Sequence, residues 1–178
     1  MLKCLNVKMK GGFTLIEMVV AVAVFTLLIS AGSGIFLSSI KAQRQSLATM
    51  EVLGQSSYLM EYMSRALRMA KKDMDGVCTG TKKLNYAFEN QCIKFKNYKN
   101  ECQQFCLVSS RLKDKDGNYL TSDALKVSSF NVTLSGQYQP PTDNLQPMLT
   151  IFLEIQGKEG SKIKIQTTIS QRNPDIRK

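Results

Sequence analysis

The 178-residue chain contains no histidine and no tryptophan. Histidine is the commonest general base near neutral pH and a common zinc ligand, so its absence weighs against most hydrolytic and zinc-dependent enzymes. No Ser/His/Asp set, phosphate-binding loop or paired-carboxylate site is assembled from the residues present. We therefore predict that the chain is not an enzyme and that it uses no cofactor.

Charge is missing from a long stretch near the N-terminus. No charged residue occurs from Met18 to Ile40, a run of 23 residues, and a helix of roughly 20 residues spans the hydrocarbon of a bilayer. The residues before this run include three lysines ahead of the first acidic residue, Glu17, which favours a cytoplasmic N-terminus and an extracytoplasmic C-terminal part. Because a carboxylate at the membrane edge is costly without a partner, Glu17 indicates a functional role.

The residues around this carboxylate resemble a known signal. The stretch Gly12–Glu17 (GFTLIE), followed by an apolar helix, is similar to the class III signal of type IV prepilins and type II secretion pseudopilins. The resemblance implies that a prepilin peptidase/N-methyltransferase cuts between Gly12 and Phe13 and methylates the new Phe13 amine. It also implies that Glu17 compensates that charged amine, in its own chain or in a neighbouring subunit of a helical filament.

The resemblance further implies partners and a location. The partners are other pilin or pseudopilin subunits, the inner-membrane assembly platform and membrane lipid. The location is the cytoplasmic membrane, crossed once, and then a pilus or pseudopilus. The stretch 62–70 together with the late strands looks more like a J-type pseudopilin or a PilW-like minor pilin, which implies a minor structural subunit.

Two simpler interpretations of the N-terminal segment stay open. An ordinary secretory signal is cleaved after its apolar core, and Ala31-Gly32-Ser33 is a weak candidate for such a site. A plain signal anchor fits the charges and the length, but it does not require Glu17 or the Gly12–Phe13 junction. The chain would then be a membrane-anchored extracytoplasmic binding protein that recognises a ligand with its C-terminal domain.

The formal net charge is +10, and it becomes +7 when the three lysines of the leader (Lys3, Lys8 and Lys10) are removed. The excess of positive charge is spread along the chain without a dense block of lysine or arginine. Nucleic-acid binding is therefore not indicated.

No proline occurs before Pro140, so nothing forces the helix to end before about Asp73–Gly76. Beyond residue 40 apolar and charged residues alternate in a pattern that predicts an amphipathic helix half. We assign its apolar residues to a seam between the helix and a sheet; they are Leu47, Met50, Leu53, Tyr58, Met60, Met63, Leu67 and Met69.

Gly32 and Gly34 interrupt the apolar run, and each lowers helix stability by up to about 1 kcal/mol relative to alanine. Two interpretations stay open for them. They allow close packing of neighbouring helices, or they mark local melting of the helix around Ala31–Gly34 during assembly.

Beyond Gly76 the hydrophobic period changes to two, which predicts strands. We expect them at 86–88, 93–95, 105–108, 125–127, 130–134, 149–155 and 163–169, with a hairpin at Gly157–Gly160. The domains are then a leader (1–12), a transmembrane and assembly helix (13–40), an amphipathic half (41–74) and an extracytoplasmic β-sheet domain (75–178). The fold class is α+β and pilin-like, with a long N-terminal helix packed on a mostly antiparallel sheet.

Four cysteines remain beyond the leader: Cys78, Cys92, Cys102 and Cys106. An even number in an extracytoplasmic domain favours disulfides, with three possible connectivities. If 92–95 pairs with 103–106, Cys92 faces Cys106 and Cys78 is left to pair with Cys102. Free thiols and a four-cysteine zinc site are the alternatives, although the spacing lacks the close C-x2-C pairs of such sites.

The stretch Asp114–Asn118 (DKDGN) is superficially similar to the start of a calcium loop, but the following acidic residue is Asp123 and not the glutamate of the helical version. We interpret the stretch as a polar turn, and we predict no metal site.

Overall fold

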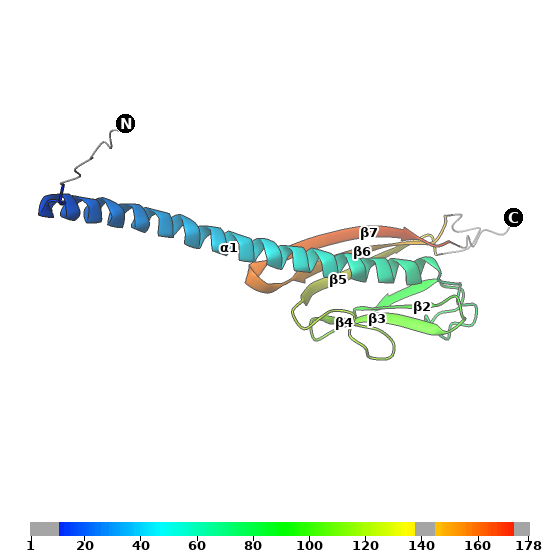
Figure 1. Ribbon diagram of the computed structural model, residues 1–178. Helices are drawn as coiled ribbons and strands as arrows, with labels where there is room; N and C mark the ends of the chain where they lie inside the picture. Colours follow the sequence, from blue (N-terminus) through cyan, green and yellow to red (C-terminus); the bar gives the residue numbers. More distant parts are fainter. Residues whose placement is uncertain (1–10, 138–144, 173–178) are drawn as a thin grey trace, which may run out of the picture. The chain divides into compact units, whose positions relative to one another are not determined.

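The computed structural model describes residues 11–137 and 145–172. They fall into two compact units, of which the first ends at Gln43 and the second begins at Arg44. One helix, α1 (Leu15–Arg68), belongs to both units, and the strands all belong to the second. The strands are β1 (Tyr86–Glu89), β2 (Cys92–Lys96), β3 (Cys102–Val108), β4 (Arg111–Lys113), β5 (Lys126–Ser135), β6 (Met148–Gln156) and β7 (Lys162–Ser170), with a 3₁₀ turn, η1 (Lys158–Gly160), before β7 (Figure 1).

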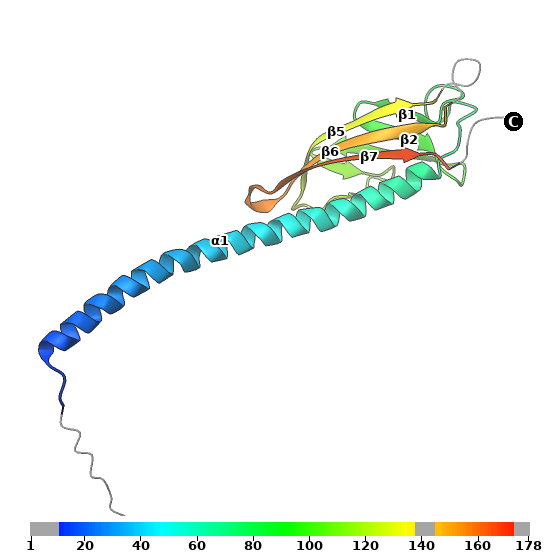
Figure 2. The ribbon, with the colours of Figure 1, turned by 90° about the horizontal axis from the view of Figure 1, so that it is seen from above.

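The strands form two antiparallel sheets with the orders β1-β2-β3-β4 and β5-β6-β7 (Figures 1 and 2). The predicted α+β class with a long N-terminal helix is therefore confirmed, but the strands divide into two sheets. The ranges 125–127 and 130–134, predicted as two strands, are one strand, because β5 has a register shift between Val127 and Ser129 that breaks the period of two. Strand β4 was not predicted, since three residues are too few to show a period.

The second half of α1 buries one face against the sheets. Its buried residues recur every three or four positions: Ala48, Val52, Ser56, Leu59, Met60, Met63 and Leu67. Apolar residues of both sheets complete the core, among them Ile93, Phe95, Phe105, Leu112, Phe130, Leu149, Ile151, Leu153 and Ile155. Such burial of an apolar helix face supplies most of the stability of a helix in a protein.

The assignment of the whole apolar set to this seam was wrong in part. Met60, Met63 and Leu67 are buried as predicted. Leu47, Met50, Leu53, Tyr58 and Met69 are instead exposed. At 100° per residue most of the exposed set lies on the opposite face of α1, which mixed spacings of two to five residues do not reveal.

Helix α1 ends at Arg68, before the predicted Asp73–Gly76. The chain beyond it joins the sheet region, where the Lys71 N–H donates to the Lys96 carbonyl at 2.8 Å. Tertiary pairing with the end of β2 thus replaces the next helical turn, although the local sequence permits that turn.

Carbonyl groups at the end of the helix and directly after it accept hydrogen bonds from distant residues. The buried Tyr86 hydroxyl donates to the Leu67 carbonyl at 2.7 Å, and the Gln171 side-chain amide donates to the Ala70 carbonyl at 2.6 Å. Asn85 donates in turn to the Gln171 side-chain oxygen. Buried carbonyls at a helix end need such partners, so these bonds attach the helix end to β1 and to the chain after β7.

The predicted hairpin at Gly157–Gly160 is confirmed, since β6 and β7 pair along their whole length on either side of η1. Gly157 lies against the helix, where a Cβ atom would come within 2.2 Å of the Val52 side chain. Only glycine leaves room for this approach, which places the hairpin beside α1.

We expect Tyr86→Phe to lower the free energy of unfolding by about 0.5–1.5 kcal/mol, because the Leu67 carbonyl loses the shorter of its two hydrogen bonds and keeps only the one from the Ala70 N–H at 3.2 Å. Urea denaturation of the full chain in micelles, followed by near-ultraviolet circular dichroism, measures the change. Tyr58→Phe is the matched control, since Tyr58 is exposed on α1. Equal unfolding midpoints for the two variants would contradict the capping role.

Candidate functional site

The helix begins with a reciprocal pair of side chains, Thr14 and Glu17. The Thr14 N–H and hydroxyl both donate to Glu17 Oε2 at 3.2 Å, and the Glu17 N–H donates to the Thr14 hydroxyl oxygen at 3.3 Å. This is a capping box, in which each side chain satisfies a backbone donor of the first turn. It explains why the helix begins at Leu15 and not at Phe13. The sequence analysis missed Thr14, although the spacing T-x-x-E is a local signal for it.

The predicted cleavage junction lies directly before this box. Gly12 and Phe13 precede the helix without regular secondary structure. The Phe13 side chain is 82% exposed, and no atom lies within 4 Å of the position of a Cβ at Gly12. Within the described residues, the Gly12–Phe13 peptide is therefore accessible. The remainder of the predicted leader, 1–10, lies outside the described residues.

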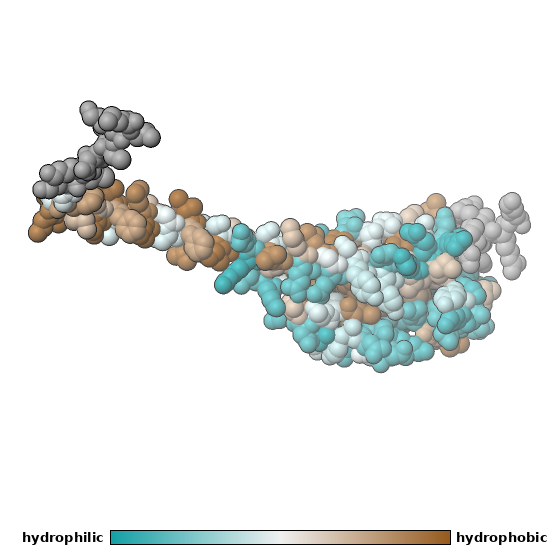
Figure 3. Space-filling model, viewed as in Figure 1, coloured by the Kyte–Doolittle hydropathy of each residue, from teal (hydrophilic) through white to brown (hydrophobic). Residues whose placement is uncertain are grey.

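The apolar run behind Glu17 makes α1 the one helix, among the described residues, that is long and apolar enough to cross a membrane. Figure 3 shows hydrophobic side chains along this part of α1. Three of its hydroxyl groups are satisfied within the helix: Thr26 donates to the Val22 and Ala23 carbonyls, Ser30 to the Thr26 carbonyl and Ser33 to the Ser30 carbonyl. A hydrocarbon environment requires such internal satisfaction, so these residues do not oppose insertion.

Gly32 and Gly34 lie inside the unbroken helix, and no atom of the described residues lies within 4 Å of where a Cβ would stand at either position. Contacts among the described residues therefore do not require glycine at these positions.

The exposed face of α1 in the second unit is unusually apolar. Leu47 and Tyr58 are 66% and 70% exposed, and Met50 and Leu53 lie between them in the sequence, also exposed. At Gly54 nothing lies within 4 Å of a Cβ position, so a neighbouring backbone has room to approach. An apolar cluster of this kind on the surface is typical of a protein–protein contact.

The four cysteines of the second unit form two disulfides, Cys78–Cys102 and Cys92–Cys106. Strands β2 and β3 pair in the predicted register, with Cys92 opposite Cys106. The connectivity is the one predicted from that register. The first disulfide joins β3 to the loop after α1, and the second links two neighbouring strands.

The loop after α1 is organised around the buried carboxylate of Asp73. Its Oδ2 accepts hydrogen bonds from the N–H groups of Cys78 (2.7 Å) and Thr79 (2.9 Å) and from the Thr79 hydroxyl (3.1 Å). The Lys96 ammonium lies 4.0 Å from Oδ1. Burial raises the pKa of Asp73, but the bonds from Thr79 and Cys78 and the charge of Lys96 outweigh it and hold the pKa below its usual value.

The stretch Asp114–Asn118 is a polar turn, as expected. Asp114 Oδ1 accepts the N–H groups of Asp116 and Asn118 at 2.9 Å each, and Oδ2 accepts the Asn118 amide at 3.1 Å. Its carboxylate therefore serves the turn. The part of the chain that the structure describes contains no group of three or more Cys, Asp or Glu residues placed to hold a metal ion.

A family model for the prokaryotic N-terminal methylation motif matches residues 7–33 of the chain. No curated protein and no solved structure matches it. The motif supports the type IV prepilin and pseudopilin type of family and a processed subunit of that type, and it points to a structural, non-enzymatic protein. Together with α1, it is consistent with an anchor that crosses the membrane once.

We expect Asp73→Asn to lower the free energy of unfolding by about 1–3 kcal/mol at pH 7, because a buried charged acceptor is lost. The folded-state pKa of Asp73 is below the unfolded one, so its stabilisation is complete above about pH 4 and is lost as pH falls further, through the folded pKa. The difference between wild type and variant should therefore shrink below about pH 4.

Urea denaturation at constant ionic strength from pH 2 to pH 8 measures this difference. Asp75→Asn is the control, because Asp75 also lies near Lys96, at 3.9 Å, but its side chain is 74% exposed. A difference between wild type and Asp73→Asn that is independent of pH would contradict the assigned role.

Proposed function

We propose that the chain is a structural subunit, of the minor class, of a type IV pilus or of a type II secretion or competence pseudopilus. A prepilin peptidase/N-methyltransferase cuts after Gly12 and methylates Phe13, and the assembly platform of the inner membrane then incorporates the subunit. One observation carries the proposal: the methylation motif at 7–33 includes an exposed Gly12–Phe13 junction directly before a capped apolar helix.

Assembly exchanges lipid contacts of the apolar run for contacts with neighbouring helices. The side chains of this run are exposed within the chain, so they are available to both environments. Gly32 and Gly34 serve the neighbouring subunits, because no atom of the described residues occupies the space that their missing side chains leave. The exposed apolar cluster of Leu47, Met50, Leu53 and Tyr58 on the second unit offers a further surface for contact with neighbouring subunits.

The carboxylate oxygen Oε1 of Glu17 is the group that we expect to bind a charged partner during assembly. Both Thr14 donors bind Oε2, and no residue among 11–43 donates to Oε1. The carboxylate therefore keeps its cap and accepts the methylated Phe13 ammonium at Oε1, in its own chain or in a neighbour. Removing one partner of a buried charge pair leaves the other uncompensated, at a cost of about 3–5 kcal/mol.

The first test is intact mass spectrometry of the chain isolated from its own membranes. We expect a mass that corresponds to residues 13–178 plus one methyl group, and a gain of four hydrogens on reduction from the two disulfides. Gly12→Leu should retain the leader, because a bulky residue blocks the cut.

Gly11→Leu is the matched control and should still lose its leader, and a second prepilin of the same cells reports that processing is active. A wild-type chain that begins at Met1 in such cells would overturn the proposal. It would favour the membrane-anchored binding protein instead.

The second test is the incorporation of Glu17→Gln into filaments. We expect normal membrane insertion and at least a tenfold loss in the sheared filament fraction, which is a conservative bound on a loss of about 3–5 kcal/mol. The ratio of filament to membrane protein, measured by immunoblotting, separates the two steps.

Thr14→Ala distinguishes the charge from the cap. It removes the capping hydroxyl, at a cost of about 0.5–2 kcal/mol, but keeps the carboxylate. If Thr14→Ala lowers incorporation as strongly as Glu17→Gln, the cap and not the charge is responsible. Equal incorporation of Glu17→Gln and wild type would contradict the assigned role of Glu17.

A further inference from the structure

The sheet β5-β6-β7 has an outer face that no described element covers. Its inner face is in the core through Leu149, Ile151 and Leu153, whereas the alternate residues point outward. The outward residues of the three strands lie opposite one another in cross-strand rows. One row contains Ser129, Glu154 and Lys164, and the next row contains Asn131, Phe152 and Gln166.

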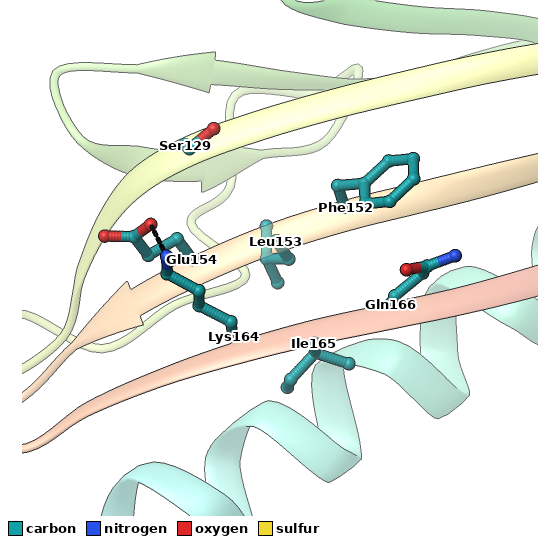
Figure 4. A pocket seen from close by; sticks show the side chains of 7 residues that line it. All are labelled: Ser129, Phe152, Leu153, Glu154, Lys164, Ile165 and Gln166. Atoms are coloured by element: carbon teal, nitrogen blue, oxygen red, sulfur yellow. Dashed lines mark ion pairs between the residues drawn. The ribbon is translucent and has the colours of Figure 1, made fainter.

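A shallow trough of about 330 Å³ lies between these two rows (Figure 4). Ser129, Glu154 and Lys164 line one side of it, and Phe152 and Gln166 the other. Successive outward side chains of a strand are about 7 Å apart, which sets the width. The volume is at the lower end of the range for small-molecule pockets, about 300–1,000 Å³.

Phe152 is the feature of the trough that the fold does not explain. Phe152 is 39% exposed, although the surrounding outward positions carry Ser, Thr, Asn, Gln, Glu and Lys. It takes no place in the core, where Phe130 of the neighbouring strand packs edge-on against Phe88. An exposed aromatic ring among hydrogen-bonding side chains is typical of a binding surface.

The opposite wall offers both donors and acceptors. Glu154 forms a close ion pair with Lys162, whereas the Lys164 ammonium lies 3.8 Å from the other carboxylate oxygen and is largely exposed. The hydrogen bond from Lys162 lowers the pKa of Glu154 more than burial raises it, so the carboxylate stays ionised. Lys164 and one oxygen of Glu154 are therefore placed to bind a ligand.

We propose that this trough binds a neutral carbohydrate, with one sugar ring against Phe152 and its hydroxyls on Glu154, Lys164 and Gln166. The carboxylate disfavours phosphate and other anions, and the ammonium disfavours cations. A single aromatic ring among polar groups does not suit an apolar peptide. A polyhydroxylated ring, with apolar C–H faces and hydroxyls that both donate and accept, matches all of these groups.

Saturation-transfer NMR on the full chain tests the proposal with four neutral trisaccharides: cellotriose, chitotriose, maltotriose and mannotriose. The micelle is lauryldimethylamine oxide, because a detergent with a sugar headgroup would compete. We expect saturation of the ring C–H protons of at least one trisaccharide. Phe152→Ser should weaken that binding about tenfold, which corresponds to 1.4 kcal/mol.

Matched variants separate the trough from the rest of the surface. Tyr98→Ser removes another exposed aromatic ring, and Lys126→Ser removes an exposed lysine of the same sheet outside the trough; both should bind as wild type. Lys164→Ser should weaken binding several-fold with an unchanged circular dichroism spectrum, which keeps the test valid if Phe152→Ser folds poorly.

Two results would overturn the proposal. One is the absence of transfer to all four trisaccharides in the wild type, including the case in which inorganic phosphate alone binds. The other is binding that both Phe152→Ser and Lys164→Ser retain. Neither result bears on cleavage at Gly12, so failure here is distinguishable from failure of the proposed function.

Discussion

The two sheets share one apolar face of a helix, and the second unit depends on this shared burial. Met63 and Leu67 of α1 are fully buried in the same core as Phe95 and Phe105 of one sheet and Leu149 and Ile151 of the other. The helix therefore supplies apolar surface against which both sheets pack. The two disulfides lie within the first sheet and its preceding loop, so they do not replace this packing.

Because the core uses one face of α1 and one face of the sheet β5-β6-β7, the opposite face of each is exposed. Once one face of α1 is committed to the core, its opposite face carries Leu47, Met50 and Tyr58 into solvent. Once the inner face of β5-β6-β7 is committed, Phe152 is left on the outer one. Apolar residues at these positions do not contribute to the core. Exposed apolar groups are typical of surfaces that a binding partner covers.

The sequence predicts those features of the structure that neighbouring residues determine, and it misses those that depend on residues distant in the sequence. The long helix, the β6–β7 hairpin and the pairing of Cys92 with Cys106 follow from local periodicity and turns. The end of α1 at Arg68 does not, because partners from Tyr86 and Gln171 decide it. The trough was not predicted either. Periodicity shows that Phe152 alternates with core residues, but it does not show which face of the sheet stays uncovered. Thr14 is different, because its T-x-x-E spacing was visible and was overlooked.

Thr14 changes how the carboxylate of Glu17 is understood. A lone carboxylate beside lipid is costly, which is why the sequence alone indicates a functional role for Glu17. The capping box shows that Glu17 is already hydrogen-bonded within its own first turn, at the positive end of the helix dipole. The carboxylate is thus already satisfied in part within its own chain. Because the box uses only Oε2, the ammonium that we propose as the partner of Glu17 would add to the box without displacing it. The assembly that we propose would then gain a charge pair without breaking the start of the helix.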